Sequence, residues 1–230
     1  MKLHKYKNYN EYLEAQKKAN INKLSWVWAD KKEIKCISDY IKKNIPNASF
    51  GICHGSRNGV EVKWFREFLG IEVIGTDISE TAKNFPNLIQ WDFHKVKDEW
   101  IDNVDFIYSN SLDHTYDPAM CLDQWMKCIK KDGLCFIEWT KGHIPSDVSD
   151  PFGATMNNYK NLIKRNYRIK NTLVLKKEQL KDSEEEEWLK KYKFFKAAGN
   201  LDKYIFVIQH RQKKQITKFL SSFLKPRRTP

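Results

Sequence analysis

Short apolar runs alternate with amphipathic segments along most of this chain, beginning near residue 48. Apolar runs of about four to eight residues bounded by Gly, Asn or Asp are typical of buried strands, and apolar positions three and four apart are typical of helices. Strands are therefore predicted over residues 48–53, 72–75, 88–91, 104–109, 134–139, 168–175 and 203–209. Helices are predicted over residues 11–23, 31–44, 59–69, 118–130 and 155–166, and over a charged stretch at 184–196.

The order of these elements predicts an α/β fold. Helical segments separate successive strands, and parallel strands need such crossover connections. Residues 141–158 have the Gly and Pro content of a long loop. We expect three parts: an N-terminal helical cap segment over residues 1–46, a main domain over 47–210 and a C-terminal tail over 211–230.

Composition is that of a globular protein. Apolar residues make up 41% of the chain and aromatic residues 13%, which excludes the disordered class. No apolar run approaches the roughly 18 residues of a membrane span, and the polar N-terminus lacks the apolar stretch of a secretory signal. We expect a cytoplasmic protein. The cysteines show no CxxC pair and are expected to be small buried side chains, not zinc ligands or a disulfide framework; they are Cys36, Cys53, Cys121, Cys128 and Cys135.

The net charge of +12 is concentrated toward the C-terminus. The last 30 residues carry eight Lys or Arg against one Asp. Between them, Ile216, Phe219, Leu220 and Phe223 recur at helical spacing. A basic amphipathic helix of this kind is typical of contact with an anionic membrane surface. Docking against the domain or a partner, and nonspecific contact with phosphates, fit the same pattern; nucleic acid is the less favoured partner but is not excluded.

Three features each follow a predicted strand, at the sheet edge where open α/β sheets bind ligands. The first is the turn Gly51-Ile-Cys-His-Gly-Ser-Arg-Asn-Gly59, whose glycines allow the backbone to approach a ligand. The second is Asp77, a carboxylate that can accept from the two hydroxyls of a ribose or cap the next helix. The third is Asp92, beside Trp91 and Phe93, which can accept from an adenine amino group or act as a cap.

Together these features resemble the class I methyltransferases that use S-adenosylmethionine (SAM). The similarity continues through the segment after the fourth strand, residues 104–118, and through the helix, turn and strand of residues 125–138. The resemblance implies a Rossmann-like, mostly parallel seven-stranded sheet flanked by helices with the last strand antiparallel, and makes residues 47–210 the SAM-binding domain. It implies cofactor contacts at Gly51, Cys53, His54, Gly55, Asn58, Gly59, Asp77, Ile78, Asp92, Phe93, Asn110, Ser111 and Leu112. The chain departs from the family in having no acidic residue at the opening of the glycine-rich turn.

The loop after the fourth strand holds the candidate catalytic residues. His114 is the leading general base because an imidazole titrates near neutral pH, and Asp113 is the second. Glu138, Trp139 and His143 follow the fifth strand and are candidates for the acceptor site. We expect no metal ion, although Asp113, Asp117 and Glu138 offer oxygen ligands that suit magnesium.

The function expected from these residues is transfer of a methyl group from SAM to a small-molecule or glycan-type acceptor, at oxygen rather than carbon. The loop after the fourth strand has no Asn-Pro-Pro-Tyr-like element, which disfavours methylation of a DNA base. Two alternatives remain open. One is an NAD(P)-dependent Rossmann oxidoreductase, and the other is a non-catalytic Rossmann-like module that binds RNA or a membrane through its basic tail.

Overall fold

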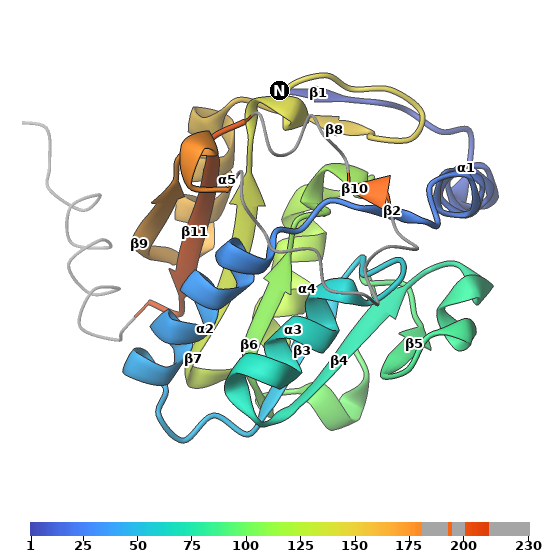
Figure 1. Cartoon of the computed structure of the whole chain (residues 1–230). Coiled ribbons are helices and arrows are strands. Elements are labelled where there is room, and N and C mark those ends of the chain that lie inside the picture. The colour runs from blue at the N-terminus through green and yellow to red at the C-terminus, as the bar shows by residue number, and fades with distance from the viewer. Residues whose placement is uncertain (181–192, 195–200, 212–230) are drawn as a thin grey trace, which may run out of the picture.

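The computed structural model of the protein describes residues 1–180, 193–194 and 201–211. At its centre is a seven-stranded sheet in the order β5-β4-β3-β6-β7-β11-β9 (Figure 1). The first five strands pair in parallel, and β11 runs antiparallel to both of its neighbours. The predicted fold class is therefore confirmed, as is the existence of all seven strands. In sheet order they span Leu88–Gln90, Glu72–Asp77, Phe50–His54, Val104–Ser109, Ile129–Trp139, Lys203–Gln209 and Arg168–Leu175.

Four of the five long helices in the described residues begin at a capping side chain, and the fifth begins after Gly59, which offers none. Asn8, Asp30, Asp117 and Thr155 each accept a hydrogen bond from a backbone amide in the first turn of the helix that follows, which satisfies donors that would otherwise lack partners. None of the helices that the structure describes is long and apolar enough to cross a membrane. The helices are α1 (Tyr9–Asn22), α2 (Lys31–Asn44), α3 (Val60–Leu69), α4 (Pro118–Cys128) and α5 (Met156–Asn166).

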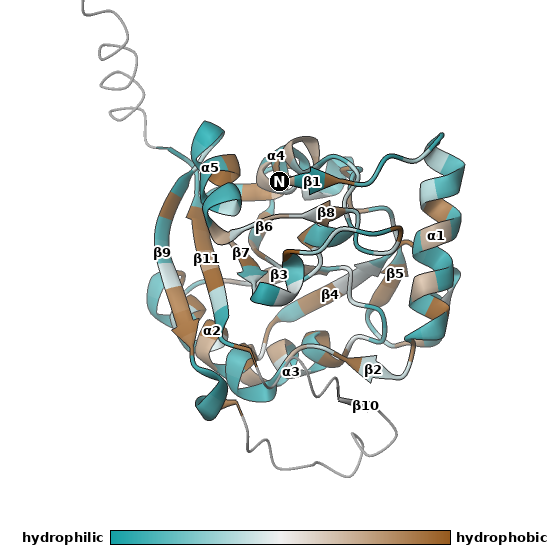
Figure 2. Cartoon of the chain, turned by 90° about the horizontal axis from the view of Figure 1, so that it is seen from above, coloured by the Kyte–Doolittle hydropathy of each residue, from teal (hydrophilic) through white to brown (hydrophobic). Residues whose placement is uncertain are grey.

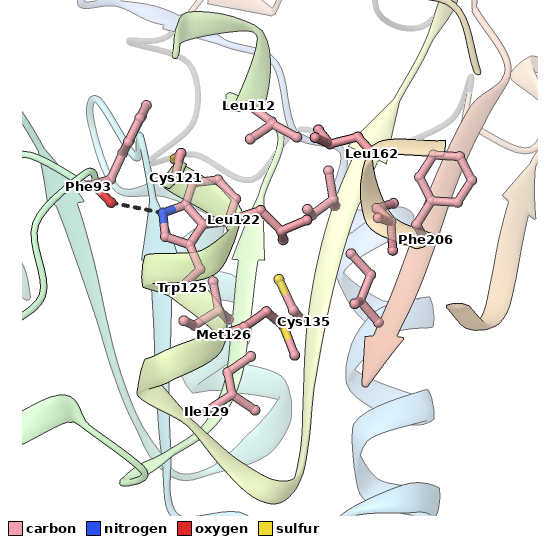
Figure 3. Close-up of a cluster of buried hydrophobic side chains, with 14 of the residues drawn as sticks. Phe93, Leu112, Cys121, Leu122, Trp125, Met126, Ile129, Cys135, Leu162 and Phe206 are labelled. Atoms are coloured by element: carbon pink, nitrogen blue, oxygen red, sulfur yellow. Dashed lines mark hydrogen bonds between the residues drawn. The ribbon is translucent and has the colours of Figure 1, made fainter. Parts of the chain in front are cut away.

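Two apolar clusters hold the helices against opposite faces of the sheet. On one face, Ile34 and Ile37 of α2 and Trp64 and Phe65 of α3 share a buried cluster with Phe106 of β6. Residues of α4 and α5 form the cluster on the other face, shown in Figure 3. Helix α2, which the sequence grouped with an N-terminal cap, thus packs in the main core. All five cysteine thiols are free, and four of them are buried.

Trp125 fixes α4 in the second cluster. Its indole Nε1 donates to the carbonyl oxygen of Phe93 at 3.0 Å, the dashed line in Figure 3. Because Phe93 follows β5, this bond ties the helix to the segment just beyond the sheet edge. The packing therefore positions a loop as well as a helix.

Helix α4 ends two residues earlier than the pattern predicts. Ile129 pairs with Val104 of β6, so the chain enters strand β7 at once, with an irregular register between Val104 and Phe106. A side chain at Gly133 would lie 2.7 Å from the carbonyl oxygen of Asp105. The residues that resemble a helix-ending turn are thus an irregularity within a longer strand.

Within the described residues, four two-residue strands lie outside the central sheet. β1 (Lys2–Leu3) pairs antiparallel with β8 (Phe152–Gly153), and β2 (Trp26–Val27) pairs in parallel with β10 (Lys193–Phe194). β8 falls within the predicted loop at 141–158. The prediction of helix is wrong at residues 193–194, because their backbone pairs with β2 as strand β10. The rest of the predicted helical stretch at 184–196 and the tail residues 212–230 lie outside the described residues.

Candidate functional site

Two adjoining cavities lie where the carboxyl ends of the parallel strands meet α1. The first cavity has an empty volume of about 520 Å³ and the second of about 900 Å³. Residues from the ends of β3, β4, β5 and β6 line the first cavity, together with one side of α1; they are Tyr12, Gln16, Ala19, Asn20, Lys23, Gly55, Arg57, Asp77, Ile78, Asp92, Phe93, Ser111 and His114. The second cavity is lined by Lys23, Trp26, Trp28, Arg57, Asn110, Ser111, Asp113, His114, Gly142, His143, Asp150 and Leu201.

Asp77, the last residue of β4, lines the first cavity. Its Oδ2 accepts from the backbone amide of Arg57 at 3.0 Å, and its Oδ1 accepts from the amide of Ser79 at 2.9 Å. Burial raises the pKa of Asp77 above its ordinary value, while these two amides oppose the shift. The carboxylate therefore fixes the glycine-rich turn and the following 3₁₀ helix, and it also faces the cavity.

Asp92, two residues beyond β5, is held in a hydrogen-bond network. Its Oδ1 lies 2.8 Å from His94 Nδ1, its Oδ2 accepts from the hydroxyl of Tyr9 at 2.8 Å, and His94 Nε2 lies 2.6 Å from Thr115 Oγ1. Burial favours the protonated acid, but the hydrogen bonds from His94 outweigh it, so the pKa of Asp92 is lowered. Asp92 is thus an oriented carboxylate at the cavity wall.

Glycine is needed at the turn after β3. Gly55 has φ +76°, and a Cβ there would lie 2.6 Å from both Cβ and Oγ of Ser111. Arg57 is also in the left-handed region, with φ 43°. The turn therefore approaches the loop after β6 closely, and its Arg57 side chain lines both cavities.

Six predicted cofactor contacts lie away from both cavities and serve the fold instead. His54 Nδ1 pairs with Thr76 Oγ1 at 2.8 Å, and its ring stacks on Trp125; burial lowers the pKa of His54 to about 3, so the imidazole is neutral. The Asn58 amide donates to the carbonyls of Leu24 and Trp26. The others are packing positions: Gly51 against Phe106, Gly59 against Leu88, and the fully buried Cys53 and Leu112.

Helix α1, part of the predicted N-terminal cap segment, covers the first cavity, but none of its residues was predicted as a site residue. Its buried residues are Tyr12, Gln16 and Asn20, four residues apart on one face. Asn20 Oδ1 accepts from the hydroxyl of Thr81 at 2.8 Å, and Gln16 Nε2 donates to the carbonyl of Ser149 at 3.1 Å. Figure 2 shows α1 lying beside the ends of β4 and β5. The spacing of Tyr12, Gln16 and Asn20 at i, i+4 and i+8 was the available signal.

The predicted catalytic residues lie at the junction of the two cavities. His114 Nδ1 lies 2.9 Å from the carbonyl oxygen of Ser149, and only an N–H can donate to a carbonyl. If the ring is neutral, this contact places its proton on Nδ1 and its lone pair on Nε2, which faces Asp113 Oδ1 at 3.9 Å. Asp150 Oδ1 lies 3.4 Å from His114 Nδ1. Asp117, by contrast, caps α4, with its side chain accepting from Met120.

A buried ionic cluster supports the wall of the second cavity. Trp28 stacks on His143 at 5.9 Å and donates through Nε1 to Glu138 at 2.6 Å. Lys203 Nζ lies 2.5 Å from Glu33 and 3.2 Å from Glu138. Burial, with the neighbouring Glu138 carboxylate, raises the pKa of Glu33 to about 8. Of the three acceptor-site candidates, His143, which follows β7, lines the second cavity; Glu138 and Trp139 are the last two residues of β7 and do not line it.

No model of a known protein family matches the chain, and no curated protein sequence matches it. Several solved structures are similar to it in fold. The 1,6-didemethyltoxoflavin-N1-methyltransferase of Burkholderia thailandensis, crystallised with 1,6-didemethyltoxoflavin and S-adenosylhomocysteine, is similar over 90% of this chain and 93% of that one, with TM-score 0.62 and 12% identity. The CMeT domain of the citrinin polyketide synthase matches over 76% of this chain and 52% of that one, with TM-score 0.51 and 12% identity.

A third solved structure belongs to an enzyme with a different reaction. The [4+2]-cyclase SpnF matches over 76% of this chain and 80% of that one, with TM-score 0.52 and 10% identity. Together the similarities establish a Rossmann-like methyltransferase fold. Since one fold carries several reactions, the activity has to be argued from the site.

Proposed function

We propose that this chain, which has the class I methyltransferase fold, is an enzyme that binds SAM in the first cavity and transfers its methyl group to an oxygen atom of a small-molecule or glycan-type acceptor in the second cavity. The observation that carries the proposal is that Asp77 and Asp92, from the ends of neighbouring strands, line one cavity that adjoins a second at His114.

The residues of the first cavity suit the parts of SAM. Asp77 can accept from the ribose hydroxyls, and Asp92 can accept from the adenine amino group beside the ring of Phe93. The turn at Gly55 and Arg57 is then left for the methionine end, where the guanidinium can pair with the carboxylate. Each carboxylate oxygen can accept a second hydrogen bond, and Arg57 has donors besides the Nη1 that donates to the carbonyl of Trp26.

The junction supplies the base that methylation of a hydroxyl uses. In the proposed reaction the acceptor oxygen forms a bond to the methyl carbon, the carbon–sulfur bond of the sulfonium breaks, and S-adenosylhomocysteine leaves. The lone pair on His114 Nε2 takes the hydroxyl proton, and Asp113 stabilises the imidazolium that results. Holding the two substrates in adjoining cavities supplies proximity, which contributes much of the rate in such transfers.

Calorimetric titration with SAM tests the cofactor assignment. We expect Asp77→Asn and Asp92→Asn each to weaken SAM binding by roughly tenfold or more, the equivalent of about 1.4 kcal/mol. The matched control is Asp98→Asn at an exposed position outside both cavities, which should bind SAM as the wild type does. Titration with NADH and NADPH tests the oxidoreductase alternative: binding of either in place of SAM, by folded protein, contradicts the proposal.

The proposal includes a cytoplasmic location and contact of the basic tail with anionic lipid. Five free cysteine thiols support a reducing compartment. Cell fractionation tests the location. Sedimentation with vesicles that contain phosphatidylserine tests the tail, because binding should weaken with salt and disappear when residues 211–230 are deleted.

A further inference from the structure

Three potential metal ligands converge at the junction of the cavities. Asp113, His114 and Asp150 each place one ligand atom so that all three lie within 4.8 Å of one another. Asp113 belongs to the 3₁₀ helix after β6, and Asp150 to the loop before β8. Two segments 35 residues apart in sequence are thus joined here through His114, whose Nδ1 contacts Ser149.

Two buried side chains at this junction lack hydrogen-bond partners. Asp113 is 7% exposed, and its Oδ1 has none; His143 is 3% exposed, and its Nδ1 has none. The Asp113 Oδ1 atom faces the lone pair of His114 Nε2 at 3.9 Å, while Asp113 Oδ2 faces His143 Nε2 at the same distance. Buried acceptors without donors are costly. A carboxylate and an imidazole lone pair that face each other repel, and a metal cation, a bridging water molecule or a second ring proton relieves this repulsion.

We propose that Asp113, His114 and Asp150 bind a divalent transition-metal ion, with His143 orienting Asp113. The mixture of one imidazole nitrogen and two carboxylate oxygens suits zinc, cobalt or iron(II) better than calcium or magnesium, which take oxygen ligands. In a tetrahedral site, ligands about 2.1 Å from the ion lie about 3.4 Å from each other, so the pair at 3.9 Å has to close by about 0.5 Å. Asp150 Oδ1 lies 3.4 Å from the other ring nitrogen, Nδ1, so this side chain, which is 36% exposed, has to move toward Nε2 to complete the set.

This site gives the proposed acceptor a chemical class, a step that rests on the proposed SAM binding and methyl transfer but replaces His114 as the general base. Three protein ligands leave coordination positions open toward the second cavity, which all three residues line. An acceptor with a hydroxyl or enol oxygen fills such a position, and the ion lowers the pKa of the bound oxygen. His114 is then a ligand, and the proton leaves the acceptor through solvent.

Metal binding is measured on tag-free, full-length protein after treatment with a chelator. Cobalt(II) is titrated while its visible absorption is recorded, and zinc is titrated by calorimetry. We expect one equivalent of each ion to bind, and Asp113→Asn and Asp150→Asn each to weaken binding by roughly tenfold or more. The matched control is Asp117→Asn, because asparagine preserves the cap of α4; it should bind metal as the wild type does.

Absence of cobalt binding by folded wild type overturns the proposal, as does equal binding by wild type and Asp150→Asn. If Asp113→Asn fails to fold, as judged by circular dichroism, the more exposed Asp150→Asn still decides. Failure of the proposed function gives a different result: SAM does not bind, whether or not metal does. If chelator-treated protein transfers the methyl group at the full rate, the metal takes no part in the reaction. That result overturns the proposed role of the ion, and His114 is then the base.

Discussion

Gly55 combines a left-handed backbone with close contact to Ser111. Substitutions at Gly55 and at Gly70 together separate these two effects. We expect Gly55→Ala to lower the free energy of unfolding by more than about 1 kcal/mol, because a Cβ raises the energy of positive φ and displaces Ser111. It should also weaken SAM binding, since both residues line the first cavity. Chemical denaturation and calorimetry measure the two effects.

The control for Gly55→Ala is Gly70→Ala. Gly70 has φ +68°, but nothing lies within 4 Å of the position of a Cβ. It should therefore show only the cost of the backbone conformation and leave SAM binding unchanged. Equal losses of stability in the two variants would contradict the argument from Ser111.

Glu33 gives the protein a dependence of stability on pH. Its pKa is raised from 4.5 to about 8 in the folded protein, so the folded state holds a proton that the unfolded state has released. Stability should therefore fall as pH rises from about 4.5 to about 8, by up to roughly a few kcal/mol. Glu33→Gln, which has no proton to release, should show a flatter profile over this window.

Denaturant unfolding at several pH values measures this slope. The control is Glu72→Gln, an exposed carboxylate at the start of β4, whose profile should follow that of the wild type. Parallel profiles for the wild type and Glu33→Gln would contradict the assignment of the proton to this cluster.

Residues that follow strands were predictable, and residues that reach the site from elsewhere were not. Asp77, Asp92 and Ser111 line the first cavity as expected, because the carboxyl ends of parallel strands meet at one edge. Tyr9 and Asp150 carry no local signal, since their contacts depend on distant segments. His54 and Gly51 lie in the predicted stretch of sequence, but their positions are packed against Trp125 and Phe106 and line neither cavity.

At the scale of elements, α1 should respond to the cofactor. Two of its three buried residues, Gln16 and Asn20, are polar, so apolar burial contributes little to holding this helix in place. A ligand in the first cavity adds contacts along the same face. We therefore expect SAM to slow amide hydrogen exchange in residues 9–22, measured by mass spectrometry.

Helix α5 is the internal reference for the exchange measurement. It packs in the apolar cluster on the far face of the sheet and lines neither cavity, so its exchange should change little. Equal slowing in α1 and α5 would indicate global stabilisation, and no slowing in α1 would contradict its contact with the ligand.

The elements themselves followed from the sequence where the pattern was long. Strands and helices of the central sheet were predicted because apolar periodicity repeats over several residues. The two-residue strands β1, β2, β8 and β10 were not, since pairing with distant segments creates them. The end of α4 was misplaced because pairing of Ile129 with Val104 outweighs the turn-like residues near Gly133.

At the scale of the whole molecule, the fold was predictable and the acceptor was not. Alternating strands and helices allow few arrangements, and the observed strand order is one of them. No comparable sequence pattern marks the residues that line the second cavity. It combines Trp26 and Trp28 from before α2, His143 from after β7, and Leu201 from beside β11. Only tertiary structure brings these residues together, so their chemistry could not be read as one site.

Four residues form walls of both cavities: Lys23, Arg57, Ser111 and His114. A ligand that moves any of them changes the affinity of the neighbouring cavity for its own ligand. Thermodynamic linkage makes such an effect reciprocal, so the factor by which one substrate strengthens or weakens the other is the same in both directions. Because the two cavities share this wall, the affinity for one substrate depends on whether the other substrate is bound. A dissociation constant measured with the neighbouring cavity empty therefore differs from the one that holds when both cavities are filled.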